Sequence, residues 1–400
     1  MTPNTFEIEV GETQQLVINV ENPVGPTEVQ SSDTGVATVD SSGLVTGVAE
    51  GSVTITATNN GVSDTASGTV TAQEPAEEGD PITLLHGVMG VPSSDSVTIK
   101  FKSATNATGV RLAYSTDPAM EEGVQYTEPQ DLDDDNYCTF TATLTGLQPD
   151  TEYYWAPFAA GELVQRNGVY GRFRTAPVGP ASFKLAFGNC NQYSSGTPRD
   201  LTVWDHIREQ EPAFLVHLDD FHYGDLTTTD VAPRVEADEE QMAMPRQGAC
   251  YWRVPLVRGM GDHDFCGNDS YGGRGDNPAA GRFAAAEAYR ITMPTPTLPH
   301  EEGMYYAFTW GRVRFIKLDG RYFRDSRWFT GPDKSMLGTT QKAWFKSELD
   351  DAAEGLADGS IALVVVMGDV PWTGSTASDA DHWAGYNAER VEIANYIESA

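Results

Sequence analysis

Short runs of alternating hydrophobic and polar residues fill the first 178 positions of the chain. This alternation has the two-residue period of β-strands, and turn-forming Gly, Ser, Pro and Asp separate the runs. We therefore expect a small all-β sandwich in residues 1–73 and another in residues 82–178, joined by an acidic linker at residues 74–81. The expected strands are residues 16–20, 36–40, 53–58, 96–102, 109–115, 138–144 and 171–177.

From residue 179 onward, apolar runs of strand length alternate with helical stretches. The expected strands are residues 183–188, 213–218, 254–260, 305–310, 313–319 and 361–367, and the expected helices are residues 339–353 and 387–399. Alternating strands and helices predict an α/β layered fold. Residues 305–310 and 313–319 are separated by two residues and predict a hairpin, so the sheets should be mixed. We thus predict a multidomain chain in which two β-sandwiches precede an α/β domain at residues 179–400.

Polar donors follow the first three strands of the α/β region. Cys190 comes after the first, Asp220 and Tyr223 after the second, and Asp262 and then Asn268 after the third. Ligands of open α/β folds gather at the carboxyl ends of strands. One aspartate after a strand is commonly a helix cap. Donors after three consecutive strands instead favour a site for hard cations with one softer ligand.

Several motifs resemble known families. The strings FGNC, HLDDFHYGD, GDHDFCGNDS, YYAFTWGRVRFIKLDGR and MLGTTQKAWFKSEL together resemble the PhoD-like alkaline phosphatases, a branch of the calcineurin-like metallophosphoesterases. Residues 31–58 resemble the bacterial Ig-like group 2 module, which implies a spacer or adhesive role. Residues 144–155 resemble the fibronectin type III corner, with Tyr153 as the corner residue, and fit the PhoD family's N-terminal domain.

The resemblance implies metal-dependent hydrolysis of phosphate mono- or diesters by a metal-activated water, within an α/β metallophosphoesterase domain. It implies Fe3+ and Ca2+ as cofactors, with Zn2+ or Mn2+ as the alternative. Its implied metal ligands are Cys190, Asp220 and Tyr223 on the iron, and Asp262 and Asn268 on the calcium side. Thiolate and phenolate suit trivalent iron, whereas carboxylate and amide oxygens suit calcium.

Two further residues are implied to be catalytic. His263 lies beside the metal ligands, where it would contact phosphate, and Arg321 would hold a carboxylate or a phosphate. The expected substrates are small phosphoesters, phospholipids or cell-wall phosphodiesters. The alternative function is a non-catalytic cell-surface adhesion protein with a degenerate phosphatase domain, attached through its Ig-like module.

The sequence departs from the family pattern at three positions near the predicted site. Asp219 stands where the family has Gly, Asn189 where it has Ser, and Gly261 where it has Asp. Family members also continue past this chain to a GDxH-type segment that supplies another ligand. Residues 368–370 resemble that segment only in part, because Pro371 follows where His is expected. We therefore expect the C-terminal part of the catalytic domain to be missing.

Charge and cysteines narrow the remaining choices. With 58 acidic and 26 basic residues, the net charge of −32 would repel nucleic acid. The opening residues lack the basic and apolar regions of a signal peptide. We expect a secreted, periplasmic or cell-surface protein whose true start is missing. A disulfide between Cys250 and Cys266 stays open, Cys138 should fill a strand position in a core, and the oligomeric state is undetermined.

Overall fold

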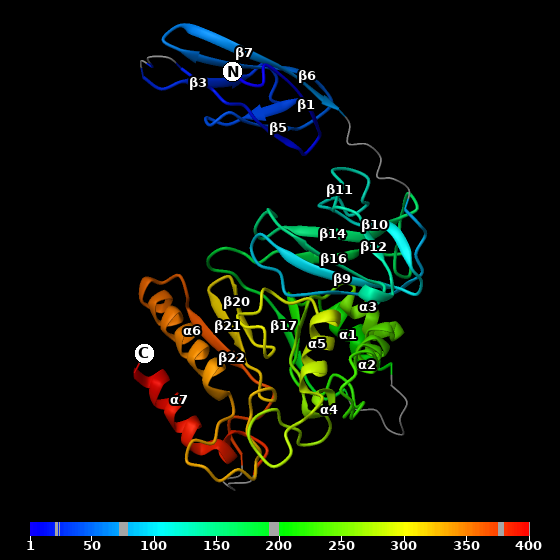
Figure 1. Ribbon diagram of the computed structural model, residues 1–400, viewed down its shortest axis with the longest axis vertical. Helices are drawn as coiled ribbons and strands as arrows, with labels where there is room; N and C mark the ends of the chain where they lie inside the picture. The colour runs from blue at the N-terminus through cyan, green and yellow to red at the C-terminus, as the bar shows by residue number, and fades with distance from the viewer. Residues whose placement is uncertain (21–22, 24, 72–78, 192–199, 375–379, 400) are drawn as a thin grey trace. The chain divides into compact units, whose positions relative to one another are not determined.

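The computed structural model describes residues 1–20, 23, 25–71, 79–191, 200–374 and 380–399. It divides the chain into two compact units, Met1–Glu77 and Glu78–Ala400 (Figure 1). Most of the predicted linker lies outside the described residues. In the part of the chain that is described, no helix combines the length and the apolar character needed to cross a membrane.

The first unit is a β-sandwich with its own apolar core. Its sheets have the strand orders β1-β7-β6-β3 and β2-β5-β4. The strands are β1 (Thr5–Glu9), β2 (Thr13–Gln15), β3 (Glu28–Ser31), β4 (Ala37–Val39), β5 (Leu44–Gly47), β6 (Gly51–Asn59) and β7 (Val62–Thr71). The strand predicted at residues 16–20 is wrong. Leu16 is fully buried, but its backbone N–H bonds to Gly43, and only Val17 forms a bridge, to Thr2.

The second unit begins with another sandwich, whose sheets are β13-β9-β8 and a six-stranded sheet around β10 and β14. The Tyr153 hydroxyl accepts a hydrogen bond of 2.9 Å from the backbone N–H of Gln148, so the predicted tyrosine corner is confirmed. The strand position predicted for Cys138 is wrong, although its side chain packs, partly buried, against the core of this sandwich. It precedes β13 with a left-handed φ of 50° and is only half-buried. The strands are β8 (Leu84–Met89), β9 (Val97–Ser103), β10 (Ala107–Ser115), β11 (Gln125–Tyr126), β12 (Gln130–Leu132), β13 (Thr139–Leu144), β14 (Glu152–Ala159), β15 (Glu162–Leu163) and β16 (Gly171–Arg174).

This second sandwich shares its core with the α/β region. Trp252, just after α3 (Pro245–Tyr251), is fully buried against Trp155 of β14, with the ring centroids 4.2 Å apart. The Lys100 ammonium of β9 donates to the carbonyls of Arg290 and Ile291, in the last turn of α5 (Arg282–Thr292). A cation at a helix C-terminus complements both the unpaired carbonyls and the helix dipole. The two parts are therefore packed as one unit.

The α/β region contains two three-stranded sheets. One is parallel throughout, in the order β17-β18-β19, and the other pairs β20 antiparallel and β22 parallel to the central β21. The predicted hairpin is thus confirmed, and that sheet is mixed. The strands are β17 (Leu185–Gly188), β18 (Phe214–His217), β19 (Leu256–Arg258), β20 (Tyr306–Trp310), β21 (Val313–Lys317) and β22 (Leu363–Met367).

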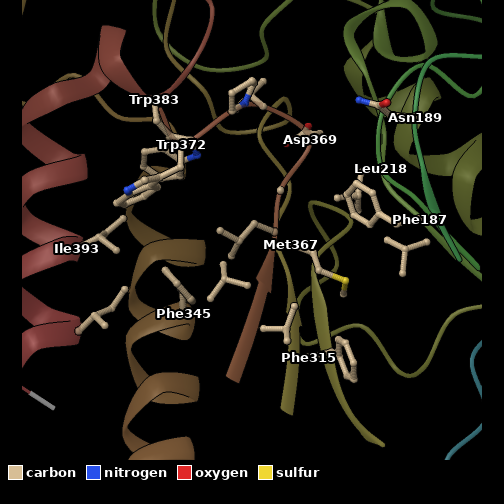
Figure 2. Close-up of a pocket in the computed structure, with 18 of the residues that line it drawn as sticks. Phe187, Asn189, Leu218, Phe315, Phe345, Met367, Asp369, Trp372, Trp383 and Ile393 are labelled. Atoms are coloured by element: carbon tan, nitrogen blue, oxygen red, sulfur yellow. The ribbon is translucent and has the colours of Figure 1, made fainter. Parts of the chain in front are cut away.

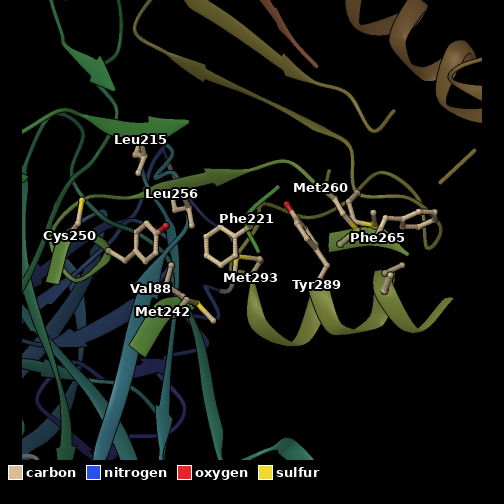
Figure 3. Packing of buried hydrophobic residues seen from close by; sticks show 14 of the residues in the cluster. Val88, Leu215, Phe221, Met242, Cys250, Leu256, Met260, Phe265, Tyr289 and Met293 are labelled. Carbon is tan, nitrogen blue, oxygen red and sulfur yellow. The ribbon is translucent and has the colours of Figure 1, made fainter. Parts of the chain in front are cut away.

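Neighbouring residues on these strands point into different cores, as strand geometry requires. Phe214 of β18 and Phe315 of β21 share an aromatic core between the two sheets. Leu215 points the other way, into the cluster of Phe221 and Tyr289 (Figure 3). Ile316 faces a further cluster. The result is a layered order of helices, sheet, sheet and helices (Figure 1).

The helices cover the outer faces of the two sheets. Helices α3 and α5 contribute to the cluster of Figure 3, whereas α6 and α7 pack on the β21 side. The predicted helix at residues 339–353 extends further in both directions, until Gly359 takes a left-handed φ of 82° and caps it. The helices are α1 (Val203–Glu209), α2 (Ala232–Ala243), α3 (Pro245–Tyr251), α4 (Asp262–Phe265), α5 (Arg282–Thr292), α6 (Gly338–Asp358) and α7 (Asn387–Ser399).

All four cysteines are free thiols. Cys250 is buried in the core of Figure 3, where burial raises its pKa to about 12. The Cys266 sulfur instead lies 3.4 Å from the Arg234 guanidinium. The disulfide that the sequence left open is therefore not formed.

Candidate metal centre

The tips of three parallel strands carry the first predicted ligands. Backbone hydrogen bonds continue beyond β17 and β18, from the Cys190 N–H to the Asp219 carbonyl at 2.7 Å and from the Asn191 N–H to the Asp220 carbonyl at 2.8 Å. Cys190 and Asp220 both have left-handed φ values, 55° and 46°. Such values are uncommon for residues other than glycine and cost free energy, so they concentrate at functional sites.

Cys190, Asp220 and Tyr223 lie together at these tips. The Cys190 sulfur is 3.5 Å from Asp220 Oδ2, and the Tyr223 hydroxyl donates to the same oxygen at 2.7 Å. The sulfur is also 4.0 Å from Asp219 Oδ2. Cys190 is exposed, so it is not a thiol of the apolar core. One ligand atom each from Cys190, Asp219 and Asp220 lie within 4.8 Å of one another. We call these three residues the Cys190 group.

A second group of possible ligands joins Asp220 to the start of α4. One oxygen each from Asp220 and Asp262 and one ring nitrogen of His263 lie within 4.8 Å of one another. The His263 ring packs against Tyr223, with centroids 4.3 Å apart, and its Nδ1 is 2.5 Å from Asp225 Oδ1. Asp220 is therefore common to both groups, which is the position a bridging carboxylate needs.

A third group extends away from the Cys190 sulfur. It consists of Asp262, Asp269 and Asp381, again with one oxygen from each within 4.8 Å. The predicted ligand Asn268 is exposed, and its amide donates to Asp269 Oδ2 at 2.9 Å. We call Asp262, Asp269 and Asp381 the Asp262 group.

Arg321 lies behind the Asp262 group and is 2% exposed. Its guanidinium is 3.2 Å from Asp381 and 3.8 Å from Asp262. Arg324 also pairs with Asp381, and Arg327 pairs with Asp269 at 2.9 Å. Each carboxylate of this group therefore has an arginine partner.

The pKa shifts in the Cys190 group and that of Asp262 in the Asp262 group have opposite directions. Partial loss of hydration raises the pKa of Cys190 to about 11, and burial raises that of Asp219 to about 8. The neighbouring carboxylates add to both shifts. Burial also raises the pKa of Asp220. At Asp262, burial acts in the same direction, but the Arg321 charge and the Asp269 N–H outweigh it and lower the pKa. At His263, burial is opposed by Asp225 and the nearby carboxylates, which raise its pKa.

The residues fit a cation. The Oδ1 atoms of Asp219 and Asp220 are buried and have no hydrogen-bond partner among the described residues. A buried, unpartnered carboxylate oxygen costs several kcal/mol unless a positive charge compensates it. The donors also suit a metal, because a thiol and a phenol accompany carboxylates on one side and carboxylates alone stand on the other.

A buried polar network fixes the loops that carry these groups. Asp264 accepts from the His222 N–H at 2.9 Å and from the Gly261 N–H at 3.1 Å. Arg258 pairs with Asp238 at 2.7 Å and lies 3.7 Å from Asp264. His222, which lies between two predicted ligands, is buried 3.4 Å from Asp238. His222 therefore supports the loop, and His217, the last residue of β18, is also buried.

Sequence reasoning missed several acids that the fold brings to this edge. Asp369 follows β22 directly and is buried, with its Oδ2 3.2 Å from the Gly320 N–H, and burial raises its pKa to about 6. Pro371 distinguishes this segment from the GDxH pattern, but the strand-end rule that predicts Asp220 also includes Asp369. Asp381 follows no strand, so the strand-end rule does not include it, and the fold brings it here beside its arginine partners.

An apolar pocket of about 450 Å³ opens beside Asp369 and Asn189 (Figure 2). Its walls come from the edge strands β17 and β22 and from helices α6 and α7. Figure 2 shows Phe187 and Leu218 on one side, and Trp372 and Trp383 on the other. The polar end of this pocket is formed by residues that follow strand tips of both sheets.

Comparison with family models places two known patterns on the chain. Residues 247–400 match the PhoD-like phosphatase model, and residues 1–70 match the bacterial Ig-like domain (group 2). Alkaline phosphatase D of Bacillus subtilis is 25% identical over 295 residues, which cover 64% of this chain and 49% of the relative. An uncharacterized protein of Mycobacterium tuberculosis is 27% identical over 244 residues, which cover 56% of this chain and 41% of the relative. The chain thus spans about half the length of the first of these curated relatives and less than half the length of the second.

Two solved structures share the fold. A structure of PhoD superposes with a TM-score of 0.66 at 21% identity and covers 79% of this chain and 69% of that chain. A purple acid phosphatase from yellow lupin (Lupinus luteus) seeds superposes with a TM-score of 0.51 at 13% identity and covers 84% of this chain and 60% of that chain. At these identities the likeness shows the fold alone.

Proposed function

We propose that this PhoD-like chain with its Ig-like N-terminus hydrolyses phosphate esters at a metal centre built on Cys190, Asp220 and Tyr223. The observation that carries the proposal is the junction at Asp220, which contacts both the Cys190 sulfur and the Tyr223 hydroxyl. Asp220 is also 5% exposed and keeps one oxygen without a hydrogen-bond partner among the described residues. A carboxylate so placed is suited to bridging two cations.

The residues suggest which metals they would hold. We propose Fe3+ at Cys190, Asp220 and Tyr223, and Ca2+ toward Asp262, Asn268 and Asp381. Zn2+ or Mn2+ is the alternative, but Cys190 and Tyr223 favour a cation that accepts sulfur and phenolate. When bound, the cations would lower the pKa of a water and offset the negative charge of the phosphoryl group.

The neighbouring side chains would orient the substrate and move protons. His263, held by Asp225 and packed on Tyr223, is proposed to donate a proton to the leaving oxygen, in keeping with its raised pKa. Arg321 is buried behind Asp262 and Asp381. That burial supports a role in positioning these carboxylates rather than in touching phosphate.

The wider setting of the enzyme is proposed from the same resemblance. A secreted or cell-surface protein would act on small phosphoesters, phospholipids or cell-wall phosphodiesters, and residues 1–73 would serve as a spacer or an attachment module. We keep the divisions near residues 73, 82 and 178 as proposed domain boundaries. The adhesion alternative is less well supported, because it gives no reason for a thiol, a phenol and a buried carboxylate to meet at two strand tips.

Turnover and metal content together test the proposal. The chain is purified, its metals are measured, and hydrolysis of p-nitrophenyl phosphate and bis(p-nitrophenyl) phosphate is followed before and after chelation. We expect activity to disappear with the metal and to return when Fe3+ and Ca2+ are restored. A visible charge-transfer band should weaken in Tyr223→Phe and Cys190→Ser.

A matched cysteine provides the control. Cys138→Ser removes another thiol that is not fully buried and should change neither metal content nor turnover. Hydrolysis that persists in metal-free protein, or equal behaviour of the Cys190 and Cys138 variants, would contradict the proposal.

A further inference from the structure

Asp219 places a further carboxylate beside the proposed metal centre. It lies between β18 and Asp220, and its backbone carbonyl accepts the Cys190 N–H at 2.7 Å. This bond holds the tips of β17 and β18 together, and it places the Asp219 carboxylate beside the Cys190 sulfur. The roles proposed above for Cys190, Asp220 and Tyr223 make no use of this carboxylate.

The space around Asp219 is shared with Gly261, on the neighbouring strand tip. A Cβ atom on Gly261 would lie 2.3 Å from Asp219 Oδ1, 2.2 Å from Asp220 Oδ1 and 2.3 Å from the Asp220 nitrogen. Side-chain carbons do not approach other atoms that closely, so any larger residue at 261 would displace these carboxylates. Two of the three positions where the sequence departs from the motif it resembles, Asp219 and Gly261, thus compete for one volume.

The Asp219 carboxylate also lacks the contacts that would make it a structural group. Its Oδ1 is buried without a hydrogen-bond partner among the described residues, and its Oδ2 faces a thiol at 4.0 Å. The adjacent Asp220 likewise has an unpartnered Oδ1. Two adjacent carboxylates with oxygens left open repel each other, unless a cation lies between them.

We infer that Asp219 is an additional ligand of the cation bound by Cys190 and Asp220, and that Gly261 is required because its missing side chain leaves room for that carboxylate. The inference rests on the proposed metal centre and deepens it. The cation at the Cys190 group would then have a thiolate and two adjacent carboxylates as ligands.

The first test replaces only the charge. Asp219→Asn should weaken Zn2+ binding to the metal-stripped protein at least about tenfold, as measured by competition with a chromophoric chelator. The same variant without metal should melt at an equal or higher temperature than wild type, because the new amide cannot ionise and so removes the repulsion between two adjacent carboxylates. Asp230→Asn, at an exposed aspartate outside the three groups, is the control and should change neither quantity.

The second test examines the shared volume with a double-mutant cycle on melting temperature. Gly261→Ala should destabilise the wild-type background more than it destabilises Asp219→Ala, because the second background lacks one of the clashing oxygens. Additive effects would overturn the claim that the two positions share space.

The outcomes separate the two proposals. If wild type binds metal and Asp219→Asn binds it within twofold, Asp219 is not a ligand, and the proposed function stands. If wild type takes up no metal at all, the proposed function fails, and this inference fails with it. A metal-free Asp219→Asn protein that is clearly less stable than wild type would instead assign Asp219 a structural role.

Discussion

The Cys190 group and the Asp262 group are both clusters of acidic residues, but among the described residues only the Asp262 group forms ion pairs with arginines. Arg321, Arg324 and Arg327 pair with the carboxylates of the Asp262 group. In the Cys190 group, Asp219 and Asp220 each keep a buried oxygen without a hydrogen-bond partner among the described residues. Acidic clusters that look alike in a sequence can therefore differ in their need for a cation.

This difference sets an order for cation binding. We expect the first cation at the Cys190 group, where it would relieve an uncompensated charge. The arginines already supply positive charge at the Asp262 group, so a Ca2+ ion there should bind more weakly. The directions of the pKa shifts agree, since those of Asp219 and Asp220 are raised and that of Asp262 is lowered.

The largest effect should come from Asp220→Asn, because Asp220 takes part in two of the three ligand groups. We expect metal content and turnover of p-nitrophenyl phosphate to fall by more than about a hundredfold. Metal analysis and steady-state kinetics measure both losses. A variant that keeps its metal would show that the groups do not depend on this shared carboxylate.

Arg321→Met should have the next largest effect, on stability. It leaves the buried Asp262 and the half-buried Asp381 with less counter-charge, and the cost should be about 3–5 kcal/mol by chemical denaturation. Millimolar Ca2+ should recover part of that loss, because the cation would replace the positive charge that Arg321 supplies in wild type. An identical loss of stability with and without Ca2+ would contradict the claim that Arg321 supplies the counter-charge of the Asp262 group. Arg172→Met, which removes a more exposed ion pair, is the control and should cost under about 1 kcal/mol.

Asp264→Ala should affect both groups alike. It removes the acceptor of the His222 and Gly261 N–H groups, which lie in the loops of the two groups, and should cost about 3 kcal/mol. Zn2+ and Ca2+ affinities should fall in parallel. If only one affinity falls, the two loops are not held by this common residue.

Arg327→Gln should give the smallest change. Its pair with Asp269 is partly exposed, so stability should change by less than about 1 kcal/mol. Calorimetric titration should nevertheless show Ca2+ binding a few-fold tighter, while Zn2+ binding is unchanged. Weaker Ca2+ binding would mean that Arg327 orders the site instead of competing with the cation.

Sequence patterns predicted the parts of the molecule that depend on local periodicity. The strand-end rule located Cys190, Asp220 and Asp262, and the corner spacing located Tyr153. Hydrophobic alternation alone predicted a strand wrongly at residues 16–20. Leu16 is buried there, but the segment forms only one isolated β-bridge, at Val17. Alternation records burial, and strand pairing requires a partner that the pattern does not name.

Long-range charge pairing could not be predicted in the same way. Asp381 meets Arg321 across sixty residues, and no spacing rule relates them. The departures at Asp219 and Gly261 were visible in the sequence, but only the coordinates place the Asp219 oxygen 2.3 Å from the position of a Cβ on Gly261. Likewise, no sequence pattern around Trp252 predicts that its side chain completes the core of the preceding sandwich.

X-ray absorption spectroscopy at the absorption edge of the bound metal is the most direct test of whether Cys190 binds that metal in the purified protein. We expect one sulfur neighbour at about 2.3 Å from the metal, together with oxygen neighbours, and the loss of that sulfur in Cys190→Ser. A wild-type spectrum with only oxygen or nitrogen neighbours would contradict this expectation, because the Cys190 group would then not hold the metal.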